Sequence, residues 1–308
     1  MTLVAVAANP HFVVQVSDRR ITAGPTVVSE ESNKAIVWTL DGARFLVGYT
    51  GIAGTTAMID THFLLCKLIQ DCAPRAECDP ENTIKLFSDE LGRVLRTRPR
   101  YRGLRMEAKR LTVMFTGLLC DAAGGGVPVQ ALVTNFQVWG SHDELRARPS
   151  FDVLWLQPKL DEAWPTLVQR IGAWNAVPIE HDDATRELLE KGKPPHAVRD
   201  RMLAMLPEWA TRAHGSVGLQ ASSVIITADL NAPARTMYHS AVNSITVFGV
   251  SQVFTTAREC VSFVDPEITA DGPNARPLAV PPVDPRRLCP CGSGKHYRDC
   301  HSQASPAR

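Results

Sequence analysis

The sequence predicts a layered α+β domain in which two β-sheets pack together and helices cover their outer faces. Short apolar runs typical of strands alternate in blocks with longer runs of helical spacing, in the order strands, helices, strands, helices, strands. The chain has 308 residues, 44% of them hydrophobic, which is enough to bury a substantial core. A short cysteine-rich segment follows the domain.

Two hairpins are predicted at the start of the chain. Apolar runs at 2–8 and 12–17 are separated by Asn-Pro-His, and those at 34–40 and 44–51 flank an Asp-Gly pair, which is a strong turn signal.

Two helices follow, because apolar residues recur at helical spacing in 55–72 and 81–98. Basic residues cluster at 93–110, which we interpret as a solvated loop between helix and strand.

The second half of the domain repeats the alternation. Helices are predicted near 160–171 and 182–191, and most clearly at 195–214, which has a proline near its start and a glycine past its end. The predicted strands are 110–121, 127–139, 222–227 and 244–250.

A proline-rich stretch without periodicity separates the domain from the tail. We therefore expect a main domain at 1–263, a linker at 264–287 and a small metal-binding segment at 288–302.

Charge and cysteine content exclude several classes of protein. The formal net charge of +1 gives no overall reason to expect binding to nucleic acid or to a membrane surface. No apolar run approaches the roughly 18 residues of a membrane-spanning helix, and the start of the chain lacks a signal-peptide pattern. We therefore expect a cytoplasmic protein without membrane insertion. Its eight cysteines would stay reduced there, so clustered ones are better explained as metal ligands than as disulfides.

Thr2 becomes the first residue if Met1 is removed, and the small side chain behind Met1 favours removal. An N-terminal threonine supplies a nucleophilic hydroxyl and, in its α-amino group, a base with a pKa of about 7.7–8.0. A nearby lysine would favour the neutral amine, and an aspartate would hold that lysine. Asp18 and Lys34 follow Thr2 at equal intervals. These residues alone leave another interpretation open: a strand-end turn with surface ion pairs at Asp18 and an edge charge at Lys34.

This stretch resembles the start of a proteasome β-subunit, or of the bacterial proteasome-like peptidase that works with an unfoldase ring. Both are N-terminal nucleophile hydrolases. That family begins with a nucleophilic threonine, carries its aspartate within Asp-x-Arg, and places a lysine on the next strand. Thr2, Asp18 with Arg20, and Lys34 match these positions without a gap. The resemblance implies a four-layer αββα sandwich.

A glycine-rich turn after the fourth strand of that family corresponds here to GYTGIAG. The family's oxyanion-hole glycine falls best on Gly51, with Gly48 the alternative. Its backbone N–H would meet the charge that develops on the attacked carbonyl oxygen.

The resemblance is specific over residues 2–75 and is one of layout beyond them. The family supports its N-terminal amine with a serine after a glycine, and with an aspartate and a serine before a late strand. Here Ala173 follows Gly172, and His214 and Ser216 stand near the latter two positions, so the supporting aspartate is absent.

Three thiols and one imidazole lie close together in the tail, LCPCGSGKHYRDCH. Cys289, Cys291, Cys300 and His301 would complete a tetrahedral structural Zn²⁺ site with no open position. The segment is too short to bury a core, so metal binding would supply its folding free energy. The other interpretation is a disordered tail with chance cysteines. The tail closely resembles the SEC-C motif, a zinc knuckle, which implies a recruitment module that contacts a protein partner or a ribosome.

Three functional interpretations follow. The first is a threonine hydrolase of the proteasome type that cleaves peptide or amide bonds, with the zinc knuckle recruiting a partner or substrate. The second is a catalytically silent assembly or adaptor protein of the same fold, and the third is an amidase for a small molecule. Because proteasome-type domains stack across subunits, we expect a homo-oligomer.

Overall fold

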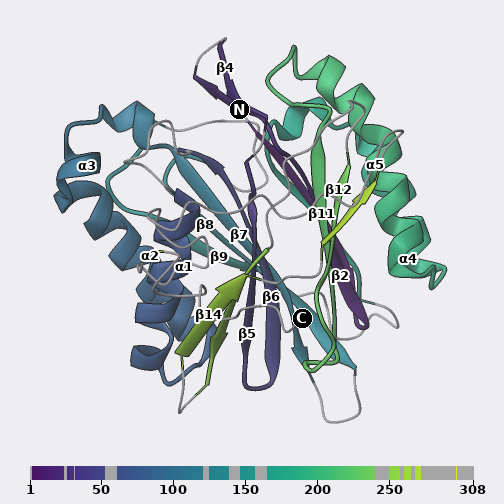
Figure 1. Ribbon diagram of the computed structural model, residues 1–308, viewed down its shortest axis with the longest axis horizontal. Helices are drawn as coiled ribbons and strands as arrows, with labels where there is room; N and C mark the ends of the chain where they lie inside the picture. The colour runs from purple at the N-terminus through teal and green to yellow at the C-terminus, as the bar shows by residue number, and fades with distance from the viewer. Residues whose placement is uncertain are drawn as a thin grey trace, which may run out of the picture.

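The computed structural model describes residues 2–23, 26–30, 32–52, 61–120, 125–138, 146–156, 165–239, 250–256, 260–264, 268–271 and 296. Two large β-sheets lie side by side in the centre, and helices lie on the outer side of each (Figure 1). The predicted mixture of α and β structure is confirmed.

The first sheet has six strands in the order β10-β1-β2-β11-β12-β15. Neighbouring strands are antiparallel, except that β12 and β15 are parallel. The strands are β1 (Leu3–Asn9), β2 (Phe12–Asp18), β10 (Leu167–Gly172), β11 (Ala221–Thr227), β12 (Arg235–His239) and β15 (Ile268–Asp271).

The second sheet has seven strands in the order β14-β13-β5-β6-β7-β8-β9. Only β13 and β5 are parallel in it. The strands are β5 (Ala35–Leu40), β6 (Ala43–Gly51), β7 (Leu111–Cys120), β8 (Gly126–Thr134), β9 (Asp152–Leu156), β13 (Ser251–Thr255) and β14 (Cys260–Val264). A small separate hairpin joins β3 (Ile21–Ala23) to β4 (Thr26–Ser29).

The helices gather in two groups. On the second sheet lie α1 (Thr61–Cys72), α2 (Pro80–Thr97) and the short α3 (Pro99–Arg102); on the first lie α4 (Ile179–Glu190) and α5 (Pro195–Arg212) (Figure 1). Short 3₁₀ turns complete the set: η1 (Pro74–Ala76), η2 (Met106–Lys109) and η3 (Trp174–Ala176). None of the helices in the described part of the chain combines the length and apolar character that a bilayer crossing requires.

Three hydrophobic regions hold these parts together. Between the sheets, Val13 and Val224 of the first contact Val37 and Leu46 of the second. The outer face of the second sheet packs against α1 and α2, and that of the first against α4 and α5. Burial of apolar surface on both faces explains why the central strands read as nearly continuous apolar runs rather than as an alternating pattern.

The two predicted N-terminal hairpins are confirmed as β1–β2 and β5–β6. The Asp-Gly turn between β5 and β6 places Gly42 at φ +75°, a conformation that favours glycine. The later helices at 182–191 and 195–214 correspond to α4 and α5.

The predicted helix near 160–171 is wrong where the structure describes it. Residues 167–172 form β10, which pairs along its whole length with β1. Leu167, Val168 and Ile171 have a spacing that fits a helix, but pairing with the edge of the sheet decides the conformation. The predicted strand at 127–139 ends at Thr134, and of the predicted strand at 244–250 only Val250 lies within the described residues.

Two expected irregular segments contain regular structure. The basic stretch 93–110 is not a loop, because it comprises the end of α2, then α3 and η2. Within the expected linker, residues 268–271 form β15 beside β12.

Candidate active site

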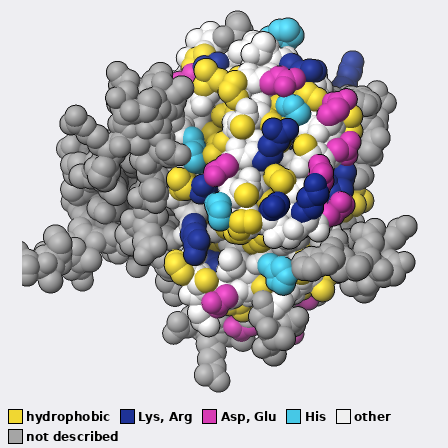
Figure 2. Space-filling model, turned by 90° about the vertical axis from the view of Figure 1, so that its right-hand side faces the viewer, with side chains coloured by type: hydrophobic (Ala, Val, Ile, Leu, Met, Phe, Trp, Pro, Cys, Tyr) yellow, Lys and Arg dark blue, Asp and Glu magenta, His cyan; other side chains and the backbone are white. Residues whose placement is uncertain are grey.

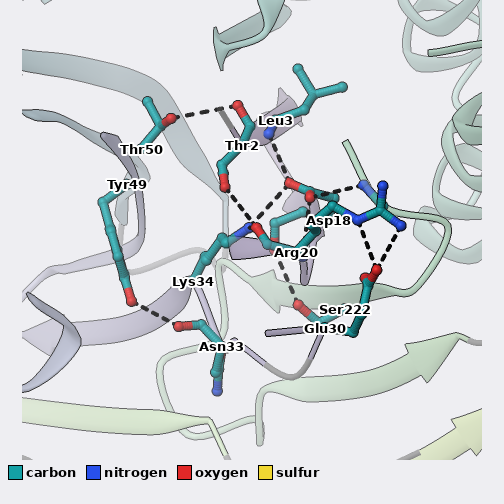
Figure 3. A network of polar contacts seen from close by, with 12 residues as sticks. Thr2, Leu3, Asp18, Arg20, Glu30, Asn33, Lys34, Tyr49, Thr50 and Ser222 are labelled. Carbon is teal, nitrogen blue, oxygen red and sulfur yellow. Dashed lines mark hydrogen bonds and ion pairs between the residues drawn. The ribbon is translucent and has the colours of Figure 1, made fainter. Parts of the chain in front are cut away.

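Hairpin geometry brings the predicted residues together. Thr2 precedes the first residue of β1, and Asp18 is the last residue of β2, so antiparallel pairing sets them at the same end of the hairpin. Lys34 stands directly before β5, in the facing sheet. The structure therefore gathers Thr2, Asp18 and Lys34 at one end of the space between the sheets (Figure 3).

The Asp18 carboxylate is the organising group of the site. It is 1% exposed. Its Oδ1 accepts hydrogen bonds from the backbone N–H of Leu3 at 2.8 Å and from Lys34 Nζ at 3.2 Å. Its Oδ2 accepts from the N–H groups of Arg20 and Gly218, both at 3.1 Å. Four donors thus satisfy a carboxylate that would be costly to bury alone.

The Lys34 ammonium is equally buried, at 1% exposure. Its Nζ donates to Asp18 Oδ1 and, at 2.7 Å, to the carbonyl oxygen of Arg20. Burial lowers the pKa of Lys34 below its ordinary value; the Asp18 carboxylate opposes this, and the nearby Arg19 adds to it. Lys34 therefore releases a proton more readily than a lysine in water would.

Thr2 points its hydroxyl at the same carbonyl. Thr2 Oγ1 donates to the Arg20 oxygen at 3.2 Å, so the threonine hydroxyl and the lysine ammonium share one acceptor (Figure 3). The carbonyl oxygen of Thr2 accepts from the N–H of Ala173 at 2.8 Å and from Thr50 Oγ1 at 3.4 Å. Hydrogen bonds therefore hold both the hydroxyl and the carbonyl of Thr2, and the residue is 7% exposed.

Glycines permit this close packing. Gly172 has φ +90°, and a Cβ there would lie 1.7 Å from the carbonyl oxygen of Thr2. Gly51, at the exposed end of β6, has φ +109°, and a Cβ would lie 2.1 Å from the carbonyl oxygen of Arg110. Gly48 instead lies between the sheets, where a Cβ would meet Val4, and it is paired with both β5 and β7. Of the two oxyanion candidates, Gly51 is the one beside Thr50 at the site.

The Arg20 side chain links the site to Glu30 and to the segment before β11. The Arg20 side chain binds Glu30 through Nε at 2.7 Å and Nη2 at 2.6 Å, and its Nη1 donates to the carbonyl oxygen of Gly215 at 2.7 Å. Gly218 in the same segment donates to Asp18. The carbonyl of Arg20, the shared acceptor, therefore belongs to a residue that is held at both backbone and side chain.

Two residues of the site were not predicted from the sequence. Thr50 and Gly218 contact Thr2 and Asp18, and their types alone carry no signal of this. Ala173, which the resemblance put near the N-terminal amine, contacts the Thr2 carbonyl through its backbone N–H. Conversely, Ser216, near an expected supporting position, bonds the carbonyl of Ala213 within its own turn at 2.8 Å, and His214 is exposed.

The four predicted zinc ligands, Cys289, Cys291, Cys300 and His301, lie outside the described residues. Among the residues that the structure describes, no group of three or more His, Cys, Asp or Glu side chains could hold a metal ion.

Comparison with known proteins gives two findings. The family model of the SEC-C motif matches residues 288–303, as expected for the tail. Two similar solved structures are the Anbu (Gly-1) mutant from Hyphomicrobium sp. strain MC1 and the Anbu (ancestral beta-subunit) from Yersinia bercovieri. Both are 13% identical to this chain, and each similarity covers 77% of it. The similarity covers 88% of the Hyphomicrobium chain with a TM-score of 0.45, and 86% of the Yersinia chain with a TM-score of 0.43. No curated protein matches the chain.

Proposed function

We propose that this protein is an N-terminal threonine hydrolase of the proteasome type, which cleaves peptide or amide bonds once Met1 is removed. The observation that carries the proposal is the buried set in which the Thr2 hydroxyl and the Lys34 ammonium share the Arg20 carbonyl, with Asp18 holding the lysine. A surface ion pair would not need this burial or these four donors to one carboxylate.

The first chemical step uses the two functional groups of Thr2. Its Oγ attacks the substrate carbonyl carbon, and its α-amino group accepts the hydroxyl proton. The positive charge of Lys34 keeps a larger fraction of that amine neutral, and Asp18 orients Lys34. The N–H of Gly51 would stabilise the oxyanion of the tetrahedral intermediate.

Collapse of that intermediate breaks the amide bond. The leaving amine takes the proton from the α-ammonium group, and the acyl group remains on Thr2 as an ester. Water then attacks the ester with the α-amine again as base, which releases the carboxylic acid and restores the threonine.

The remaining parts of the molecule fit the proposal. Two packed sheets with helices on their outer faces are what a four-layer αββα sandwich of the N-terminal nucleophile hydrolase type would require, and they support the proposal. We place the linker at 272–287, after β15, and a structural Zn²⁺ at Cys289, Cys291, Cys300 and His301. The SEC-C segment would bring a protein partner or substrate to the domain.

The direct experiment is turnover of a panel of fluorogenic peptide amides by wild-type protein and matched variants. Thr2→Ala and Lys34→Ala should each lower kcat/KM by orders of magnitude, and the double variant should lose little more, because members of one catalytic unit are not additive. Thr211→Ala and Lys193→Ala, both on the exposed surface of α5 and its preceding turn, serve as controls and should match wild type. Equal turnover by wild type and Thr2→Ala would rule the proposal out.

One observation favours a second candidate, a catalytically silent assembly or adaptor protein. Ala173 stands where the related enzymes have a serine, and Ser216 bonds its own turn rather than Thr2. A Thr2→Ala strain that matches wild type in vivo, while a Cys289→Ser strain does not, would support the adaptor instead.

A further inference from the structure

A basic surface lies on the α2–α3 side of the molecule, opposite α4 and α5 (Figure 1). Residues 93–110 contain eight Lys and Arg residues and one Glu, in a chain whose total net charge is +1. In the folded protein this stretch runs through the end of α2, α3 and η2, so its charges are displayed by three consecutive ordered elements.

Three cationic side chains meet at a shallow depression beside these elements. Arg96 of α2, Lys109 of η2 and Arg148 of the segment before β9 line it, and the other lining residues carry no charge. Arg96 Nη1 is anchored to the carbonyl oxygen of Pro149 at 2.7 Å. Arg148 also pairs with Asp152, so Arg96 and Lys109 are the two cations here without a carboxylate partner among the described residues, and their mutual repulsion would be relieved by a bound anion.

A buried asparagine builds this arrangement. Asn135 is 1% exposed, and its Nδ2 donates to the carbonyl oxygens of Lys109 at 3.1 Å and Arg148 at 3.0 Å. Its Oδ1 accepts from the N–H of Leu111 at 3.0 Å. One side chain thus fixes the two segments that supply cations, so their proximity is a property of the fold rather than of mobile surface residues.

Two of the cations have unused donors. Lys109 is 6% exposed, yet no described residue forms a hydrogen bond or ion pair with its ammonium group. Arg148 pairs through Nη2 with Asp152, but its Nε is buried and has no acceptor within the described part of the chain. Of these donors, Arg148 Nε is enclosed by the protein, whereas the Lys109 ammonium is not among the enclosed atoms and is the group that an anionic ligand could reach.

The adjacent arginines extend the positive charge. Arg98, Arg102 and Arg105 are exposed, and no carboxylate of the described residues pairs with them. The α4–α5 face differs, because acidic and basic side chains alternate there (Figure 2). Ion pairs such as Arg186–Asp183, at 2.8 Å, neutralise that face locally.

We propose that the surface formed by Arg96, Arg98, Arg102, Arg105, Lys109 and Arg148 binds the phosphate backbone of a nucleic acid. Guanidinium groups present planar forks that match phosphate oxygens, and the buried Lys109 adds a point charge. The arginines continue from the depression along α3, so the surface fits a repeating polyanion better than a single small anion. The overall charge gave no reason to expect this, because acidic residues elsewhere cancel the local excess.

The test is fluorescence anisotropy of the full chain with a labelled single-stranded RNA of twenty nucleotides and the matching DNA. Arg98→Ala/Arg102→Ala/Arg105→Ala should weaken binding about tenfold or more, and should reduce the slope of log K against log[salt] by about 2, at roughly 0.7 per lost phosphate contact. Lys109→Met should weaken binding severalfold, while Lys109→Arg keeps the charge and should retain it. Backbone contacts carry no sequence information, so RNA and DNA should behave alike.

Lys193→Ala/Arg201→Ala/Arg212→Ala, with the same change in charge on the α4–α5 side, is the matched control and should stay within twofold of wild type. Equal losses of affinity in the two triple variants would mean that binding depends on net charge alone, and this would overturn the proposal. Competition by poly-glutamate as strong as that by RNA would overturn it in favour of an acidic protein partner.

Discussion

At the scale of single residues, the site depends on a carboxylate that serves the fold as well as the chemistry. Asp18 accepts from three backbone N–H groups and one ammonium, whereas Lys34 donates to two acceptors among the described residues, Asp18 and the Arg20 carbonyl. Loss of Asp18 would take the carboxylate acceptor from three backbone N–H groups and would leave Lys34 with the Arg20 carbonyl. Loss of Lys34 leaves the carboxylate with three of its donors, so the two residues should differ in their effect on stability.

Asp18→Ala is therefore expected to lower the free energy of unfolding by about 3–5 kcal/mol, the range for breaking a buried ion pair. Lys34→Met should lower it by about 1–3 kcal/mol, since only one donor is removed. Urea unfolding at pH 7 measures both. A larger loss for Lys34→Met than for Asp18→Ala would contradict the bonding described here.

The lowered pKa of Lys34 predicts a pH dependence of stability. Its folded pKa lies below the ordinary value of 10.5, so between the two the unfolded chain binds more protons and stability rises with pH. The stability that follows from having a neutral Lys34 is fully present above pH 10.5, and it is lost as the pH falls through the pKa of Lys34 in the folded protein. The unfolding free energy of wild type minus that of Lys34→Met should thus increase from pH 7 to pH 10. A constant difference over that range would count against the burial of a charged lysine.

Gly172 offers a sharper test of how Thr2 is held. Gly172→Ala adds a Cβ that would overlap the Thr2 carbonyl, at φ +90°, and should lower both stability and turnover. Gly192→Ala is the control, because Gly192 has φ +62° but nothing within 4 Å of an added Cβ. It should cost only about 1 kcal/mol, the strain of the backbone alone. Similar thermal unfolding for the two variants would mean that contact with Thr2 is unimportant.

The residues that sequence could and could not predict differ in a physical way. Thr2, Asp18 and Lys34 have functional side chains, and the resemblance to a known family pointed to them where type and spacing alone left another interpretation open. Ala173 and Gly218 act through backbone N–H groups, which every residue except proline has, so only the folded chain reveals them.

At the scale of secondary-structure elements, pairing with distant strands determined whether a segment became helix or strand where the spacing of apolar residues fitted both. The hairpins β1–β2 and β5–β6 were predictable because turn residues interrupt apolar runs. The conformation of β10 was not, since it depends on β1, which lies more than 150 residues earlier in the chain. The conformation of β15 was unpredictable for the same reason, because its parallel partner β12 is separated from it in the sequence by β13 and β14.

The pairing of β15 predicts where the domain can be cut. A chain that ends after Asp271 should unfold like the full chain. One that ends after Val264 lacks the ladder to β12 and should lose about 1–2 kcal/mol of unfolding free energy. Circular dichroism of both truncations during urea titration decides this. If neither truncation changes the midpoint, β15 does not belong to the stable domain.

At the scale of the whole molecule, a large folded domain is followed by a short tail that matches the SEC-C motif, for which we propose metal binding. We expect one Zn²⁺ per chain, lost in Cys289→Ser or Cys291→Ser, with the main unfolding transition unchanged because a structural zinc stabilises only the segment that it folds. Metal analysis and calorimetry of the same samples test this. Zinc retained in both variants would place the metal elsewhere.

Assembly belongs to the same scale. If the proposed function holds, we expect a homo-oligomer that stacks through its helices, and the exposed Ile179 on α4 is an apolar group that such a contact would cover. Sedimentation velocity at micromolar concentrations measures the assembly. A monomer throughout that range would contradict the expectation without affecting the chemistry of Thr2.

Intact-mass spectrometry with and without a β-lactone or epoxyketone probe tests whether Thr2 is a free N-terminal nucleophile. We expect a mass without Met1 and one added probe per chain, mapped to Thr2 and absent from Thr2→Ala. Quantitative retention of Met1 would bury the proposed base in a peptide bond, and together with an unlabelled Thr2 it would show that Thr2 is not the nucleophile.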